Sequence, residues 1–173
     1  LDLMIHDIDL VLSFVQSPVS EIRASGVGIF TPTIDIATAR IEFVNGAIAN
    51  VTSSRVSMKQ ERTLRFFQRD AYVKMDFLSK QVRIIKKSDN VDKLLPLILS
   101  GVVDINPEQL LDIQNYDVGD TEKDALTLEL ESFVDCVYNN KKPIVDGLAG
   151  TRALEIAIKI TNQIQAQNAK LRA

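Results

Sequence analysis

Cysteine and histidine are scarce in this chain, and it has no long apolar run. The one cysteine, Cys136, excludes an internal disulfide and a cysteine-based metal site. No uninterrupted apolar segment approaches the roughly 20 residues of a membrane-spanning helix, so no membrane partner is expected. With 46% hydrophobic and 25% charged residues, the 173-residue sequence predicts one well-packed domain over residues 1–173.

Positive charge is not in excess either. The formal net charge is −3 and no basic run stands out, which argues against nucleic acid as a partner. Residues 62–69 do mix aromatic and basic side chains, but they alternate as a strand does. We therefore interpret this segment as a sheet or dimer surface.

Two kinds of periodicity follow one another along the chain. A helix is expected from Leu1 to Val15, before Pro18, because a residue preceding proline avoids the helical region. Period-2 alternation, with Asn45-Gly46 as a hairpin turn, then predicts strands at Ile22–Ile29, Ile36–Phe43, Ala47–Ser57, Thr63–Gln68, Ala71–Asp76 and Gln81–Lys87.

The second half of the chain is less regular. Leu110–Tyr116 is a further candidate strand, whereas the apolar segment Leu94–Val103, interrupted by Pro96 and Gly101, is left unassigned. One helix is expected after a capping box at Thr121 and Asp124, and a longer one from about Leu148 to Lys170.

Consecutive strands with short connections predict an α+β fold with a predominantly antiparallel open sheet and helices packed on one face. The other face would carry Leu64, Phe66 and Val73 or their alternates. Because an uncovered face of this composition tends to meet another sheet, we expect at least a dimer through the open face.

The lone histidine belongs to a polar stripe. On a helix, Asp2, His6, Asp9 and Ser13 share one face, and apolar residues cover the rest of the surface. Imidazole titrates near neutrality, which suits it to accept or donate a proton in catalysis. The alternative is a packed helix residue with a satisfied ring. A metal site is less favoured, because no second histidine or nearby cysteine supplies further ligands.

Three groups of residues, in their order and spacing, resemble one family over nearly the whole chain. They are Asp2-x-x-x-His6-Asp7-Ile8-Asp9, the hairpin strands from Asp35 to Ala49, and the closing segments at Leu128–Phe133, Lys142–Gly147 and Ala153-Leu154. The chain resembles the C-terminal, substrate-binding and oligomerisation domain of the glucose–fructose oxidoreductase, inositol dehydrogenase and rhizopine catabolism (Gfo/Idh/MocA) family. Its opening run and Ser54-Arg55-Val56-Ser57 are most similar to the UDP-N-acetylglucosamine 3-dehydrogenase-like branch.

The resemblance implies a fold like the C-terminal domains of dihydrodipicolinate reductase and glyceraldehyde-3-phosphate dehydrogenase. It also implies a cytoplasmic homo-oligomer, a dimer or tetramer, that oxidises a hydroxyl of a sugar, cyclitol or nucleotide sugar with NAD or NADP. In this family an N-terminal Rossmann domain holds the cofactor. The sequence contains no Gly-x-Gly-x-x-Gly after a strand and no Glu-Lys-Pro segment, and Gly26-Val27-Gly28 has no helix after it. We therefore expect a fragment that by itself binds no dinucleotide and is inactive.

The resemblance also implies roles for individual residues. His6 would be the general acid/base, and Asp2 would orient it or bind the substrate hydroxyl. Asp9 matches a less specific trailing acid, a candidate substrate-binding residue for which a structural role is the alternative. No residue of the chain is expected to bind the cofactor or a metal.

Arg55 is a further candidate substrate-binding residue, because its guanidinium suits a sugar or a phosphate. The alternative for its segment, Asn50–Ser57, is a sheet face that meets another subunit or water. The competing hypothesis for the whole chain is a non-catalytic ligand-binding or assembly domain with a vestigial active-site motif.

Overall fold

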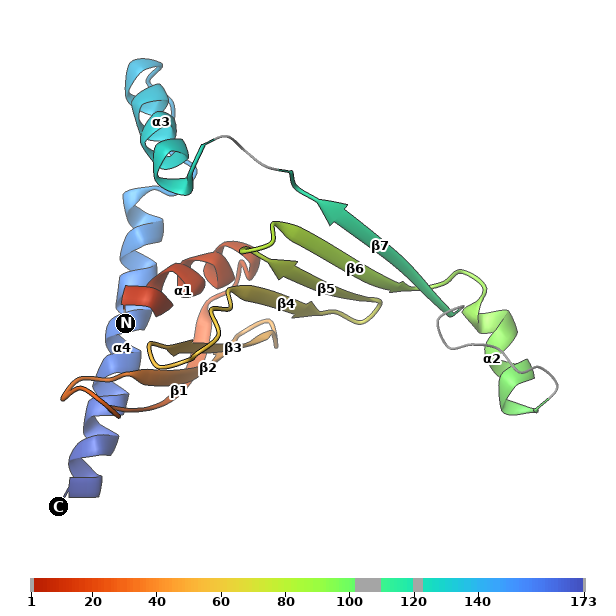
Figure 1. Ribbon diagram of the computed structural model, residues 1–173, viewed down its shortest axis with the longest axis horizontal. Coiled ribbons are helices and arrows are strands. Elements are labelled where there is room, and N and C mark those ends of the chain that lie inside the picture. Colours follow the sequence, from red (N-terminus) through yellow and green to blue (C-terminus); the bar gives the residue numbers. More distant parts are fainter. Residues whose placement is uncertain (1, 102–109, 120–122, 173) are drawn as a thin grey trace. The chain divides into compact units, whose positions relative to one another are not determined.

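The computed structural model describes residues 2–101, 110–119 and 123–172, in two compact units. The first unit, Leu1–Met58 with Leu126–Ala173, holds α1 (Asp2–Phe14), β1 (Val19–Val27), β2 (Ile36–Phe43), β3 (Ile48–Ser54), α3 (Ala125–Tyr138) and α4 (Gly147–Arg172). The second unit, Lys59–Ala125, holds β4 (Thr63–Phe67), β5 (Ala71–Asp76), β6 (Gln81–Lys87), α2 (Val91–Leu99) and β7 (Leu111–Asp117). Figure 1 labels these elements.

The sheet of the first unit is an antiparallel meander in the order β1-β2-β3. Strand β2 alternates between buried and less buried positions, and Ala37, Ala39, Ile41 and Phe43 are its buried residues. At the β2–β3 turn, Gly46 has a φ of +84°, a backbone conformation that glycine adopts without steric cost. The predicted hairpin is therefore confirmed.

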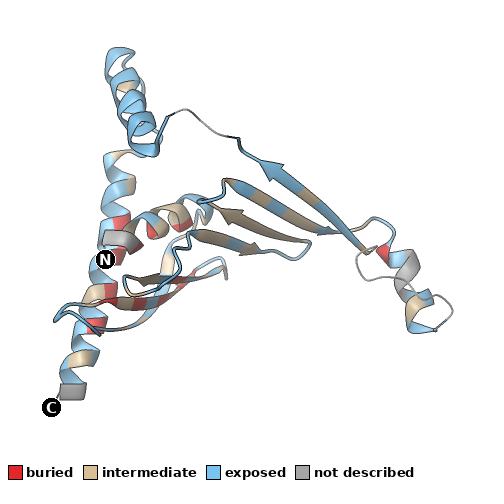
Figure 2. Ribbon diagram, viewed as in Figure 1, coloured by how far each residue is buried: buried red, intermediate tan, exposed pale blue. Residues whose placement is uncertain are grey.

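Helices α1 and α4 pack together, α1 also on β3 and α4 also on β1. The small Gly26 makes the close approach of α4 possible, because an added Cβ would lie 3.1 Å from the Ile164 side chain and 2.9 Å from the Ile36 carbonyl oxygen. The core is formed by Met4, Ile8 and Val11 of α1, by Ala153, Ile156, Ala157, Ile160 and Ile164 of α4, and by the buried residues of the sheet. These positions are the red bands in Figure 2.

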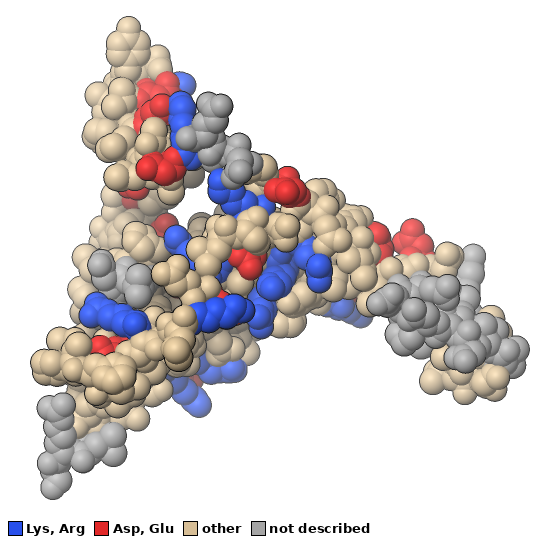
Figure 3. Space-filling view, viewed as in Figure 1, with Lys and Arg blue, Asp and Glu red and all other residues tan. Residues whose placement is uncertain are grey.

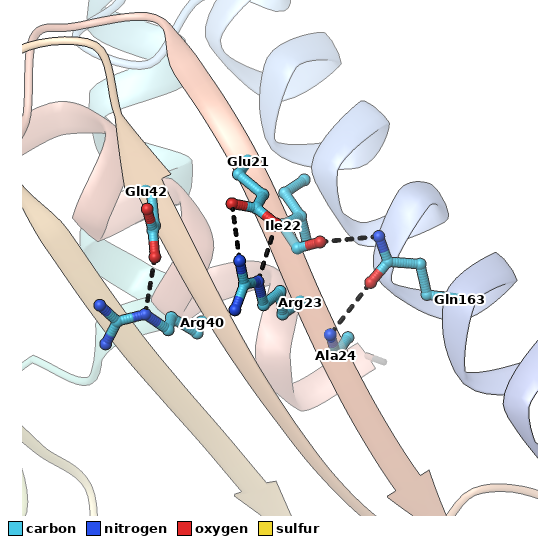
Figure 4. A network of polar contacts seen from close by, with 7 residues as sticks. All are labelled: Glu21, Ile22, Arg23, Ala24, Arg40, Glu42 and Gln163. Atoms are coloured by element: carbon cyan, nitrogen blue, oxygen red, sulfur yellow. Dashed lines mark hydrogen bonds and ion pairs between the residues drawn. The ribbon is translucent and has the colours of Figure 1, made fainter.

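A side-chain amide joins α4 to the outer strand β1. Gln163 accepts a hydrogen bond from the Ala24 N–H at 3.0 Å and donates one to the Ile22 carbonyl at 2.8 Å (Figure 4). On the same sheet, Glu21 with Arg23 and Glu42 with Arg40 form two neighbouring ion pairs at 2.7 and 2.8 Å. The Glu21–Arg23 pair is exposed and the Glu42–Arg40 pair is partly exposed, so both contribute little to stability.

The second unit is a four-stranded antiparallel sheet in the order β4-β5-β6-β7. Its register aligns Phe66, Val73 and Ile84 on one face, beside the row Leu64, Met75 and Val82. The register aligns Arg65, Lys74 and Arg83 on the opposite face. Figure 3 shows Lys and Arg side chains gathered over this region. The strand alternation predicted for residues 62–69 is therefore correct, and Phe67 with its partner Tyr72 lies on the same face as the basic row.

The antiparallel α+β class is confirmed, while the strands form two sheets rather than the single one that we predict from sequence. Most element bounds agree within two or three residues. The apolar segment left unassigned forms helix α2, with Pro96 inside it. Thr121 of the predicted capping box lies outside the described residues, and α3 begins at Ala125. The prediction of one domain over residues 1–173 stays a prediction.

Helix α3 differs from the expectation that every helix packs on a sheet. Its apolar stripe is exposed, with Leu126, Leu130, Phe133 and Val137 each 56–67% accessible. A stripe of this regularity belongs to a helix that packs against something, yet no residue of α3 is buried in the described structure. Among the described residues, no helix combines the length and apolar character of a bilayer-spanning segment.

Candidate functional site

Helix α1 has a buried side and a polar side, as the sequence predicts. Met4 and Ile8 are fully buried, and they lie one turn apart on the side that faces the core. His6 is exposed and Asp9 is half-buried on the polar side, where the Ser13 hydroxyl donates to the Leu10 carbonyl at 2.7 Å. Asp2 begins the helix, one turn before His6, but its side chain lies outside the described part of the structure. An exposed imidazole argues against the alternative of a ring packed in the interior.

Arg55 follows strand β3 directly, and its side chain is exposed. Its backbone N–H donates to the Asp35 carbonyl at 2.9 Å, which fixes the start of the segment after the strand. Arg55 lines two hollows of the first unit. The smaller one, about 20 Å³, also has Met4 and Asp35 in its wall.

The larger hollow, about 500 Å³, lies between α4 and the loop that joins β1 to β2. We call it the α4 groove. Its lining residues are Gly28, Pro32, Thr33, Ile34, Arg55, Thr161, Gln165, Asn168 and Ala169. Arg55 is the one charged residue among them, so the groove has a positive electrostatic character. A concave site of this size, with a few convergent polar groups, is typical of small-molecule sites.

A buried carboxylate organises the loop on one side of the α4 groove. Asp35 is 4% exposed, and its Oδ2 accepts hydrogen bonds from the backbone N–H groups of Ile29, Phe30 and Thr31 at 2.8, 2.8 and 3.0 Å. Its Oδ1 accepts from the Thr31 hydroxyl at 2.7 Å. The Thr31 hydroxyl and these three backbone donors hold the pKa of Asp35 well below its ordinary value, so the charged form is the one that shapes the loop.

The loop also depends on a glycine. A Cβ added to Gly28 would lie 2.3 Å from the Thr33 carbonyl oxygen and 2.6 Å from that of Thr31, which is closer than any Cβ contact tolerates. Only glycine therefore allows the tight closure of this loop.

The structure places Arg55 at a hollow that Met4 also lines, and it places His6 on the polar side of α1. Met4, which shares the small hollow with Arg55, lies about 160° around the helix axis from His6 by the 3.6-residue period. The site residues therefore stay a prediction. Asp35, Gln165 and Asn168 were not assigned to any site from the sequence. The sequence pattern that could have indicated a structured loop is Thr31-Pro32-Thr33 followed by Asp35, directly before a strand.

No three side chains of His, Cys, Asp or Glu gather as metal ligands within the described part of the chain. Gly26-Val27-Gly28 leads from β1 into a loop and then into β2, so it lacks the helix that a dinucleotide-binding turn requires. The Gly26–Gly28 segment is thus not a dinucleotide-binding turn of this kind.

The chain is similar in sequence to known proteins. The model of the GFO/IDH/MocA C-terminal domain matches residues 1–73. The chain is 31% identical over 166 residues to a UDP-N-acetylglucosamine 3-dehydrogenase of Acidithiobacillus ferrooxidans, covering 96% of this chain and 48% of that protein. The chain therefore spans about half the length of the curated relative that it matches.

The chain is also similar in structure to solved dehydrogenases. The structure of UDP-N-acetylglucosamine 3-dehydrogenase GnnA from Acidithiobacillus ferrooxidans matches with a TM-score of 0.78 and 29% identity over 94% of this chain and 47% of that one. A levoglucosan dehydrogenase in complex with NADH and levoglucosan shares the fold, with a TM-score of 0.73 at 13% identity, over 94% of this chain and 47% of that one. Residues 1–73 are thus similar to the Gfo/Idh/MocA C-terminal domain, and the chain has the fold of the matching half of these dehydrogenases.

Proposed function

We propose that this chain is the substrate-binding half of a dehydrogenase that oxidises a hydroxyl of a nucleotide sugar of the UDP-N-acetylglucosamine type. The identity of 31% across nearly the whole chain to a UDP-N-acetylglucosamine 3-dehydrogenase supports the substrate class. The exposed position of His6 on the polar side of α1 is the structural observation that carries the proposal, because a catalytic base must be reachable by its substrate.

His6 acts on the hydroxyl proton in this proposal. Oxidation of an alcohol to a ketone removes a hydride from the carbinol carbon and a proton from the oxygen. The proton passes to the imidazole of His6, and Asp2, one turn earlier on the helix, orients the ring or binds the hydroxyl. Asp9, half-buried on the same side of the helix, binds the substrate or holds neighbouring residues of the site in place. NAD or NADP supplies the hydride acceptor and is held by a Rossmann domain outside this sequence.

The exposed apolar stripe of α3 is consistent with such a second domain. Its residues would be costly to leave in water along a whole helix, and the relatives are about twice as long as this chain. In this proposal the other half of the protein packs against α3.

The proposal also covers the oligomeric state and the cellular location of the intact protein. The apolar face of the second sheet, with Leu64, Phe66 and Val73 half-buried, pairs with a second copy to give at least a dimer. The intact protein is cytoplasmic. Light scattering tests the assembly, and a monodisperse monomer at high concentration would contradict it.

A substrate screen of the intact protein tests the activity. We expect NAD or NADP to be reduced with UDP-N-acetylglucosamine, but not with free inositol or glucose. The reverse preference would remove the nucleotide-sugar assignment. The competing proposal, a non-catalytic ligand-binding or assembly domain, predicts no reduction with any of them, and it would also prevail if no Rossmann motif is encoded before Leu1.

A further inference from the structure

The α4 groove has a chemistry of its own that the proposed proton transfer does not use. Among the described residues its one cation is Arg55, and no carboxylate lines it. The nearby carboxylate of Asp35 is already occupied by the backbone N–H groups and the hydroxyl of the loop. Within the same part of the chain the Arg55 side chain forms no ion pair, so its charge is available to an anion. A guanidinium binds phosphate through two parallel hydrogen bonds.

The remaining lining suits a ring that carries hydroxyl and amide groups. Gln165 and Asn168 lie about one turn apart on α4, and Gln165 also lies one turn after Thr161, so the three side chains share one face of the helix. The two amides offer both donors and acceptors. Pro32 and Ile34 on the facing loop add apolar contact area. A nucleoside presents this combination, with an apolar ring face and polar edges.

The groove is also built before any ligand arrives. The carboxylate of Asp35 fixes the loop through four hydrogen bonds, and Gly28 lets it close tightly. On the opposite wall, Gln163 ties α4 to the sheet. A preorganised site loses less entropy when a ligand binds.

We propose that the α4 groove binds the nucleoside diphosphate part of the substrate, with Arg55 on the phosphates and Gln165 and Asn168 on the nucleoside. This inference rests on the proposed nucleotide-sugar dehydrogenase function. It makes Gln165 and Asn168 specificity-determining residues for the nucleoside. Binding of the non-reacting part of a substrate then provides affinity that a free sugar lacks.

Calorimetric titration of the full-length protein with UDP, uridine and inorganic diphosphate separates the two halves of the site. Arg55→Gln is expected to weaken UDP binding by about tenfold or more and to remove the response to inorganic diphosphate, because one charged partner is lost. Gln165→Ala with Asn168→Ala is expected to weaken uridine and UDP by about tenfold while leaving diphosphate binding unchanged. Asn168→Asp, which keeps the shape of the side chain, is expected to weaken diphosphate and UDP by charge repulsion.

Gln167→Ala is the matched control, since Gln167 is an exposed amide on the same helix that does not line the groove. Its affinity for UDP is expected to equal that of the unchanged protein. The variants alter exposed or half-buried side chains, and matching melting curves show that they are folded. The proposal is overturned if UDP does not bind the unchanged protein, or if it binds all folded variants equally well.

The outcomes for the groove and for the proposed function are distinguishable. The protein could bind UDP in a way that depends on Arg55 and yet oxidise no nucleotide sugar. This result would support the proposed UDP site in the α4 groove and refute the proposed dehydrogenase activity. Conversely, the protein could oxidise a nucleotide sugar while every groove variant keeps its affinity for UDP. This result would support the dehydrogenase activity and refute the proposed UDP site in the α4 groove.

Discussion

The side-chain amide of Gln163 on α4 pairs with the backbone of Ala24 on β1, accepting from its N–H at 3.0 Å. The same amide donates to the carbonyl of Ile22, so one side chain satisfies two backbone groups of an outer strand. An outer strand otherwise leaves such groups free to pair with another chain. The contact fixes where α4 lies on the sheet, and thereby sets one wall of the α4 groove.

Replacing Gln163 by leucine is expected to reduce the free energy of unfolding by about 1–2 kcal/mol, because two hydrogen bonds are lost. Chemical denaturation measures the change. Gln167→Leu, on the same helix but with no hydrogen bond to the sheet, is expected to change stability by less than about 0.5 kcal/mol. Equal effects of the two substitutions would show that the amide contact does not stabilise the sheet.

Asp35→Asn is expected to destabilise the first unit and to alter its response to acid. The pKa of Asp35 is lowered in the folded protein, so the carboxylate's contribution is complete above its ordinary unfolded pKa and is lost as pH falls through the lower folded value. Melting temperatures measured from neutral pH down into the acid range below the ordinary carboxyl pKa check this sign. The variant is expected to show a smaller loss over the acid range than the unchanged protein, since asparagine does not titrate.

Ile160→Ala tests the packing of α4 on the sheet. Ile160 is fully buried, and removing its side chain is expected to lower the free energy of unfolding by about 2–5 kcal/mol. Asn162→Ala, at an exposed position on the same helix, is expected to cost little. A small loss for Ile160→Ala would contradict the position of α4 on this core.

Phe133→Ala tests whether α3 packs against another part of the longer protein. Phe133 is 63% exposed in this chain, so its removal from the isolated chain is expected to change stability by less than about 0.5 kcal/mol. In the longer protein we expect a loss of at least about 1 kcal/mol, because the side chain is then covered. Ser132→Ala, a substitution at the neighbouring polar position, serves as the control in both the isolated chain and the longer protein. Equally small losses would mean that nothing covers this stripe.

The sequence predicts the parts of the fold that depend on local pattern. The alternation from Ile36 to Phe43 predicts both a strand and its buried face, and the spacing of Ala153, Ala157, Ile160 and Ile164 predicts the buried side of α4. Asn45-Gly46 predicts its hairpin because its turn requires a positive φ. Each of these features is decided by residues that are close in the sequence.

The features that the sequence does not reveal depend on distant residues. Gln163 contacts a strand about 140 positions earlier, and the α4 groove joins residues near position 30 to residues near position 165. No periodicity records such pairs. The polar stripe of α1 was predictable as a helix face, whereas the hollow that Arg55 shares with Met4 required coordinates.

The most direct test of the account is the turnover of the intact protein with His6 replaced by alanine. We expect kcat for oxidation of UDP-N-acetylglucosamine to fall by about two orders of magnitude or more, because the base that accepts the hydroxyl proton is lost. Added imidazole is expected to restore part of the rate, while Ser13→Ala on the same side of α1 retains full activity. An unchanged rate in a folded His6→Ala variant would contradict the role of His6 and favour a non-catalytic domain.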